Sequence, residues 1–251
     1  GMALGDFLAK ELNLSGRKAK NLLDQRCVFV NGNRIWMARH ELDPGDQVEV
    51  LLPKDASPAE NATLPILYQD DDLVIINKPA GILTNDGKSA EALLRIQLNC
   101  PTLRAVHRLD KDTTGCLLFA MHAEARTKLV ELFTERKIRK QYHAIVNGQI
   151  TDRQRKIDSP IDRQEAITHI TVVDAGREAT HLTADIETGR THQIRKHLAS
   201  IRHPVLGDRQ YATGRELSPR ERSIHRQMLH AHRIEFSHPL ADRKIVCIAP
   251  L

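Results

Sequence analysis

The centre of the chain reads Ala105-Val106-His107-Arg108-Leu109-Asp110-Lys111-Asp112-Thr113-Thr114-Gly115 and continues into the apolar run Cys116-Leu117-Leu118-Phe119-Ala120. The apolar run predicts a buried strand. Arg108 and Asp110 are two residues apart, so their side chains point the same way if this segment is extended. A carboxylate and a guanidinium would then share one face at the edge of a buried strand. On these residues alone, a surface salt bridge beside a turn is the simpler interpretation.

The length and composition are those of a globular protein with a sizeable core. A chain of 251 residues fits one large or two smaller domains. No apolar run approaches the roughly 20 residues that span a bilayer, and no basic-then-apolar leader is present. The four cysteines are far apart and form no Cys-x-x-Cys pair: Cys27, Cys100, Cys116 and Cys247. We therefore expect a cytoplasmic protein with reduced thiols and no contact with a membrane.

The net charge of +5 is unevenly distributed along the chain. Residues 1–52 hold 7 basic and 7 acidic side chains, and residues 53–72 hold 1 basic and 5 acidic ones. Residues 73–251 hold 29 basic and 20 acidic side chains. A basic excess in the large C-terminal part is typical of proteins that bind a polyanion, although charge alone does not identify nucleic acid as the partner.

Residues 3–52 are predicted to form a small separate domain. Leu4, Leu8 and Leu12 mark one face of a helix, and Ser15 is a good N-cap for a second helix through residue 25. The pair Asn31-Gly32 follows a short apolar run, which is the strongest short signal of a β-hairpin. Residues 53–65 contain three prolines among small and acidic residues and are predicted to be an extended linker.

The second helix and the hairpin of this domain carry a basic surface. The pattern Ser15-Gly16-Arg17-Lys18-Ala19-Lys20-Asn21-Leu22-Leu23, followed by residues 28–35, resembles the S-four-like RNA-binding domain first known from a ribosomal protein. The resemblance implies that Arg17, Lys18, Lys20 and Arg34 bind RNA. A solvated amphipathic helix is the alternative interpretation of the same charges.

Residues 66–251 are predicted to form a larger α+β domain. Alternating apolar residues predict strands at 137–146, 182–186, 233–236 and 244–248, and helical spacing predicts helices at 123–136 and 191–201. Strands and helices do not alternate regularly, so a mixed sheet fits better than a doubly wound one.

Four motifs in this domain occur in the order of a known enzyme family. His107-Arg108-Leu109-Asp110 followed by Thr113-Thr114-Gly115, then residues 140–144, residues 187–199 and residues 229–231, resemble the RluA-type pseudouridine synthases. The likeness covers residues 66–251; Thr114 stands where the family more often has serine. It implies the pseudouridine synthase fold, a mixed and mainly antiparallel sheet with flanking helices. It also implies an isomerase that converts uridine to pseudouridine in RNA and uses no cofactor.

The resemblance assigns roles to individual residues. Asp110 is expected to attack the nucleoside or to remove the 2′ proton of its sugar, and the sequence leaves both routes open. Arg195 is the expected cationic partner of Asp110, and Tyr142 is expected to face the uracil ring. Residues expected to bind the extruded nucleotide or its phosphates are Arg108, Arg190, Ile194 and Leu229.

No metal site is predicted. The triplet Asp70-Asp71-Asp72 lacks the spaced ligands of a calcium loop and fits a solvated turn. His192 and His197 are five residues apart, and no His-Glu-x-x-His helix is present to hold zinc.

The expected partner is structured RNA, ribosomal RNA in preference to transfer RNA, and the protein is expected to be a monomer. An RNA-binding or ribosome-assembly protein that has lost catalysis on the same fold is the alternative function. A nucleic-acid hydrolase that uses a pair of carboxylates is disfavoured. Asp112 is the one other carboxylate near Asp110 in the motif, and it is expected to lie on the opposite side of the turn or to be exposed.

Overall fold

The structure is a computed structural model that describes residues 2–24, 28–50, 63–212 and 219–251. The chain divides into two compact units. The N-terminal unit combines Gly1–Asp55 with Leu206–Gln227, and the sheet unit combines Ala56–Val205 with Met228–Leu251. Of the linker predicted at residues 53–65, residues 53–62 lie outside the described residues.

The N-terminal unit has the predicted order of helix, helix and hairpin. Its elements are β1 (Met2–Ala3), α1 (Leu4–Glu11), α2 (Gly16–Asp24), β2 (Val28–Val30), β3 (Asn33–Arg34), β4 (Glu41–Leu42), β5 (Val48–Val50) and α6 (Pro219–Arg222). Ser15 Oγ accepts the Lys18 N–H at the start of α2. Asn31 and Gly32 turn the hairpin with φ angles of 50° and 79°, which matches the preference of Asn-Gly for this turn.

Residues 206–227 differ from the predicted division, in which they belonged to one continuous domain at 66–251. They group with the N-terminal residues because two side chains of that part bind them. Arg34 Nη1 donates to the carbonyls of Arg209 at 2.6 Å and of Ala212 at 3.2 Å. Glu49 accepts from Arg222 Nη1 at 3.0 Å.

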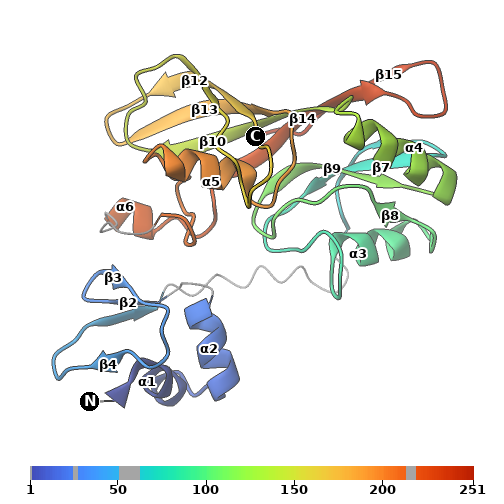
Figure 1. The fold of residues 1–251 in the computed structure, drawn as a ribbon. Helices are drawn as coiled ribbons and strands as arrows, with labels where there is room; N and C mark the ends of the chain where they lie inside the picture. The colour runs from blue at the N-terminus through green and yellow to red at the C-terminus, as the bar shows by residue number, and fades with distance from the viewer. Residues whose placement is uncertain (1, 25–27, 51–62, 213–218) are drawn as a thin grey trace. The chain divides into compact units, whose positions relative to one another are not determined.

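Among the described residues, the sheet unit contains a ten-stranded mixed sheet (Figure 1). The main path of the sheet runs β11-β12-β13-β10-β14-β9-β7-β6, with β15 beside β14 and β8 beside β9. Strand pairs are antiparallel except the parallel pair β14–β9 at its centre. The strands are β6 (Ile66–Gln69), β7 (Leu73–Lys78), β8 (Arg104–Ala105), β9 (Thr114–Ala120), β10 (Arg139–Asn147), β11 (Gln154–Ile157), β12 (Thr168–Ala175), β13 (Ala179–Ile186), β14 (Leu229–Ser237) and β15 (Lys244–Ile248).

Helices cover both faces of this sheet. One face packs against α3 (Ala90–Gln97) and α5 (Gln193–Ser200), through Leu94, Ile194 and Leu198. The opposite face packs against α4 (Ala123–Thr134). Figure 1 shows α5 beside the half of the sheet that contains β10 and β13. The predicted α+β class, with a mainly antiparallel sheet and flanking helices, is confirmed. No described helix combines the length and hydropathy needed to cross a bilayer.

The central motif lies between two strands of the sheet and is not itself part of a strand. The buried strand begins at Thr114, as β9, and β8 ends at Ala105. Arg108 and Asp110 therefore lie in a loop between two strands, and the turn at Lys111 and Asp112 closes it. A loop releases these side chains from the sheet and lets them face a pocket.

Candidate active site

A pocket on the α5 side of the sheet unit gathers the predicted catalytic and substrate-binding residues. Its walls come from the loop at 108–113, from the segment 189–195, and from single residues of β10, β13 and β14. The predicted residues that line it are Arg108, Asp110, Tyr142, Arg190, Ile194, Arg195 and Leu229. Segments distant in sequence thus meet at one place, as the four motifs predicted.

Asp110 and Arg195 form the ion pair of the pocket. Arg195 Nη1 lies 2.8 Å from Asp110 Oδ2. The side chain of Arg195 is 8% exposed and that of Asp110 is 21% exposed. A hydrogen bond between two charged groups is strong and directional. The nearly buried guanidinium of Arg195 therefore fixes the position of Oδ2 of Asp110.

The loop that carries Asp110 is supported by buried polar groups. Thr84 Oγ1 both accepts the Leu109 N–H and donates to the Leu109 carbonyl, at 3.0 Å each. Lys78 is fully buried, and its Nζ donates to the carbonyls of Pro79, Ile82 and Lys111 at 2.9 Å each. Lys78 therefore ties two loops together through backbone acceptors.

Gly115 allows the close approach of β9 and β14 beneath the pocket. Its φ is +106°, and a Cβ at this position would lie 2.2 Å from the carbonyl oxygen of Ala231. Both the conformation and the contact exclude a larger residue. The Thr-Thr-Gly end of the motif thus permits the parallel pairing of β9 with β14, the strand that supplies Leu229 to the pocket.

Tyr142 is a buried residue of β10 with its side chain in the core around the pocket. Burial, and then the negative charge of Asp110, raise the pKa of its phenol. The ring therefore stays neutral near pH 7. It offers a flat apolar face and a hydroxyl that can donate a proton or a hydrogen bond.

Gln193 organises the segment before α5, a role that the sequence did not reveal. Its Oε1 accepts from the Thr188 hydroxyl at 2.7 Å and from the Arg190 N–H at 3.0 Å. Its Nε2 donates to the Ile167 carbonyl at 2.9 Å and to Thr168 Oγ1 at 3.1 Å. A buried amide with all these partners orders the loop that presents Arg190 to the pocket.

The remaining predicted residues differ in exposure. Arg108 is exposed, while Ile194 and Leu229 are buried, with exposed fractions of 5% and 4%. Arg190 Nε donates to the Glu165 carbonyl at 2.9 Å.

His107, just before Arg108, is a neutral residue of the motif. Its Nε2 accepts the Leu118 N–H. Burial, and then the charge of Lys140, lower the pKa of His107 to about 3.

In the N-terminal unit, the predicted RNA-binding residues separate into two kinds. Arg17, Lys18 and Lys20 are exposed on α2. Arg34 is partly buried, donates to carbonyls of residues 209 and 212, and lies 5.1 Å from the centre of the Phe29 ring. Its guanidinium thus serves the packing of the unit itself.

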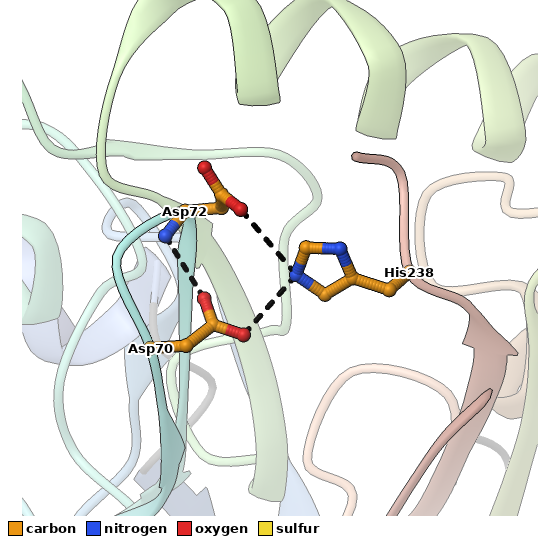
Figure 2. A group of neighbouring side chains, drawn as sticks. All are labelled: Asp70, Asp72 and His238. Atoms are coloured by element: carbon orange, nitrogen blue, oxygen red, sulfur yellow. Dashed lines mark hydrogen bonds and ion pairs between the residues drawn. The ribbon is translucent and has the colours of Figure 1, made fainter. Parts of the chain in front are cut away.

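A second cluster unites two of the three consecutive aspartates with a distant histidine (Figure 2). His238 Nε2 lies 3.1 Å from Asp70 Oδ2 and 3.7 Å from Asp72 Oδ2. Asp70 Oδ2 also accepts from the Tyr68 hydroxyl at 2.6 Å and from Arg243 at 2.7 Å. Oδ2 of Asp70 already accepts these hydrogen bonds, and the guanidinium of Arg243 already balances its charge. Both facts disfavour a metal ion at this cluster.

The geometry of this cluster fits a structural clamp. His238 Nδ1 accepts the Leu240 N–H, which leaves the hydrogen on Nε2 to be donated to the carboxylates. The aspartates lie in the turn between β6 and β7, and His238 follows β14. The turn predicted as solvated therefore binds the segment that follows β14.

Comparisons with known proteins point to one family. The family described as RNA pseudouridylate synthase matches residues 72–200. "Ribosomal large subunit pseudouridine synthase D" of Pasteurella multocida is 34% identical, over 100% of this chain and 88% of its own length. An uncharacterized RNA pseudouridine synthase of Bacillus subtilis is 36% identical, over 82% of this chain and 76% of its own.

A solved structure agrees with these relatives. "Human RNA Pseudouridylate Synthase Domain Containing 1" is similar with a TM-score of 0.66 and 26% identity, and the match covers 77% of this chain and 86% of that one.

Proposed function

Since the chain belongs to the RNA pseudouridylate synthase family, we propose that it acts on ribosomal RNA of the large subunit, with Asp110 as the reacting carboxylate. The protein is an enzyme that isomerises uridine to pseudouridine in RNA. The observation that carries the proposal is the pocket in which Asp110, paired with Arg195, faces the same space as the buried phenol of Tyr142.

The reaction is an intramolecular isomerisation and needs no second substrate. The bond from nitrogen 1 of uracil to the sugar breaks, the base turns, and carbon 5 bonds to the same sugar carbon. Carbon 5 then loses its proton to water and nitrogen 1 gains one, so the atoms balance and a tritium at carbon 5 is released. No electrons, water or transferred group are consumed, so the proposal includes no cofactor. Asp110 either attacks the nucleoside or removes the 2′ proton of the sugar. Tyr142 provides a neutral ring on which the detached uracil stays in place.

The target uridine must leave its helix, which costs a few kcal/mol. Arg108 is exposed at the pocket, and a guanidinium can stack in the vacated space or bind the neighbouring phosphate. Arg190 is proposed to hold a second phosphate. Ile194 and Leu229 are buried apolar residues of the lining, and we assign them to contact with the flipped base.

Residues 3–52, within the N-terminal unit, are proposed to be an S-four-like RNA-binding domain. The exposed side chains of Arg17, Lys18 and Lys20 on α2 suit contacts with the phosphate backbone. Arg34, whose guanidinium binds carbonyls of residues 209 and 212, is proposed to support this surface by ordering that segment.

Ribosomal RNA is favoured over transfer RNA because the relatives from Pasteurella multocida, Haemophilus ducreyi and Vibrio parahaemolyticus are named for the large ribosomal subunit. We further propose that the protein is a cytoplasmic monomer. A silent RNA-binding protein on the same fold is the second candidate, and the close pairing of Asp110 with Arg195 disfavours it.

The choice of RNA is tested with transcripts labelled with tritium at carbon 5 of uracil. Large-subunit ribosomal RNA, small-subunit ribosomal RNA and transfer RNA are incubated separately with the protein in the absence of magnesium, and tritium released into water is counted. We expect release from the large-subunit RNA at least tenfold above the other two. Equal or greater release from transfer RNA would contradict the ribosomal assignment, and binding without release from any RNA would favour the silent protein.

A further inference from the structure

His192 has an unusual backbone at the edge of the pocket. It is the residue immediately before α5, and its φ and ψ of 56° and 28° are left-handed. A residue other than glycine adopts this conformation only uncommonly, although histidine does so more often than most, as asparagine and aspartate do, and such strain persists where the surrounding structure holds it, often at functional sites. The side chain makes no hydrogen bond that caps the helix, and the residue lines the pocket.

The imidazole of His192 faces the carboxylate oxygen that Arg195 leaves open. His192 Nε2 lies 3.6 Å from Asp110 Oδ1, whereas Arg195 Nη1 lies 2.8 Å from Oδ2. The distance to Oδ1 exceeds hydrogen-bond length. Such contacts at active sites are often long without substrate and shorten in the complex. The imidazole side chain is 24% exposed.

We propose that His192 is a positioning residue that holds Oδ1 of Asp110 when RNA fills the pocket. With Arg195 on one oxygen and His192 on the other, the carboxylate cannot rotate about its terminal bond. The left-handed backbone at residue 192 is what directs the imidazole away from the helix and towards Asp110. The other charged or titratable groups of the pocket lining are Arg108, Tyr142 and Arg190. This inference rests on the isomerase activity and not on which RNA is modified.

The unusual backbone permits a sharp test. In His192→Gly the left-handed conformation becomes favourable, so the variant loses the imidazole without added strain. In His192→Gln the side-chain amide extends about as far as the imidazole Nε2 and can still donate to Oδ1. Arg202 has a similar φ of 65° just beyond the other end of α5. Arg202→Gly is therefore the matched control for relief of strain alone.

The substrate is bulk RNA labelled at uracil carbon 5, from cells that lack the gene, so that any natural target is present. Single-turnover tritium release gives the rate constant at saturating enzyme and the enzyme concentration for half that rate. We expect His192→Gly to lower the rate constant about tenfold or more, since small misplacements of reacting groups cost up to about a hundredfold. The half-saturating concentration should stay within about twofold, and the melting temperature should not fall.

His192→Gln should recover a measurable part of the rate lost in His192→Gly, and Arg202→Gly should keep the wild-type rate. A His192→Gly variant with a rate constant within twofold of wild type would overturn the proposal. So would a change confined to the half-saturating concentration, which would make His192 an RNA-binding residue. A glutamine variant no faster than the glycine variant would show that a hydrogen-bond donor at this position is not needed.

Discussion

Arg195 Nη1 lies 2.8 Å from Oδ2 of Asp110, although the two residues are 85 positions apart in the sequence. Arg195 projects from the first turn of α5, and Asp110 from the loop before β9. Packing of Ile194 and Leu198 against the sheet sets the position of α5. The packing of the core therefore brings Arg195 within hydrogen-bond distance of Asp110.

Replacing Arg195 should remove activity more than it removes stability. Arg195→Met keeps much of the buried aliphatic volume but leaves Asp110 without its charged hydrogen bond, and we expect turnover to fall about a hundredfold or more. Single-turnover tritium release measures the effect. Lys196→Met is the control, because Lys196 pairs with the exposed Asp162 and such surface pairs contribute little. A rate within tenfold of wild type for Arg195→Met would contradict the assigned role.

Gly115→Ala should destabilise the sheet unit strongly. The added Cβ would lie 2.2 Å from the Ala231 carbonyl oxygen at a φ of +106°. We expect a loss of about 3 kcal/mol or more in the free energy of unfolding, at the upper end of the cost of overpacking. Urea denaturation followed by circular dichroism measures it. Gly176→Ala, whose Cβ would meet its nearest atom at 3.4 Å, should change the stability far less; equal effects of the two would refute the close-approach argument.

His107 should make the protein less stable in acid. Its pKa is lowered from 6.5 to about 3, first by burial and then by the charge of Lys140. The unfolded chain therefore takes up a proton that the folded chain refuses, so stability falls as the pH drops from about 6.5 towards 3. His107→Gln retains an acceptor for the Leu118 N–H but does not titrate. Its unfolding free energy should depend less on pH in this window, and identical pH profiles for variant and wild type would disprove the assignment.

The helix α2 should contribute electrostatic affinity for RNA. Exchange of Arg17, Lys18 and Lys20 for alanine removes three exposed cations. The slope of log affinity against log salt should then decrease by about 2 to 3, if each cation neutralises one phosphate. Filter binding at several salt concentrations measures the slope. Lys10→Ala, on the neighbouring α1, serves as the control; an unchanged slope for the triple variant would show that α2 does not touch phosphate.

The strongest apolar patterns of the sequence predicted their elements well. The run 116–120 became β9, and helical spacing at 123–136 and 191–201 became α4 and α5 with shifted ends. Local pattern sufficed there because each element buries one continuous face. Arg108 and Asp110 both line the pocket, in agreement with the shared face that their spacing suggested. They lie in a loop rather than in a strand, and the buried hydroxyl of Thr84 and the amine of Lys78 hold that loop.

Contacts between distant segments were beyond local pattern. The meeting of Asp110 with Arg195 followed from the family resemblance, whereas spacing alone left a surface salt bridge as the simpler interpretation. No local pattern predicted that Gln193 orders the loop before α5. Nor did it indicate that His238 would clamp Asp70 and Asp72, 168 residues away from Asp70 along the chain. Each of these side chains acquires its partner through tertiary packing.

The central claim is that the carboxylate of Asp110 performs the isomerisation. The most direct measurement is single-turnover tritium release from RNA labelled at uracil carbon 5, without magnesium, for Asp110→Asn beside the matched variant Asp112→Asn in the same loop. We predict no detectable release from the first variant, near wild-type release from the second, and wild-type RNA affinity for both. Sustained release by Asp110→Asn, or equal loss in both variants, would contradict the account.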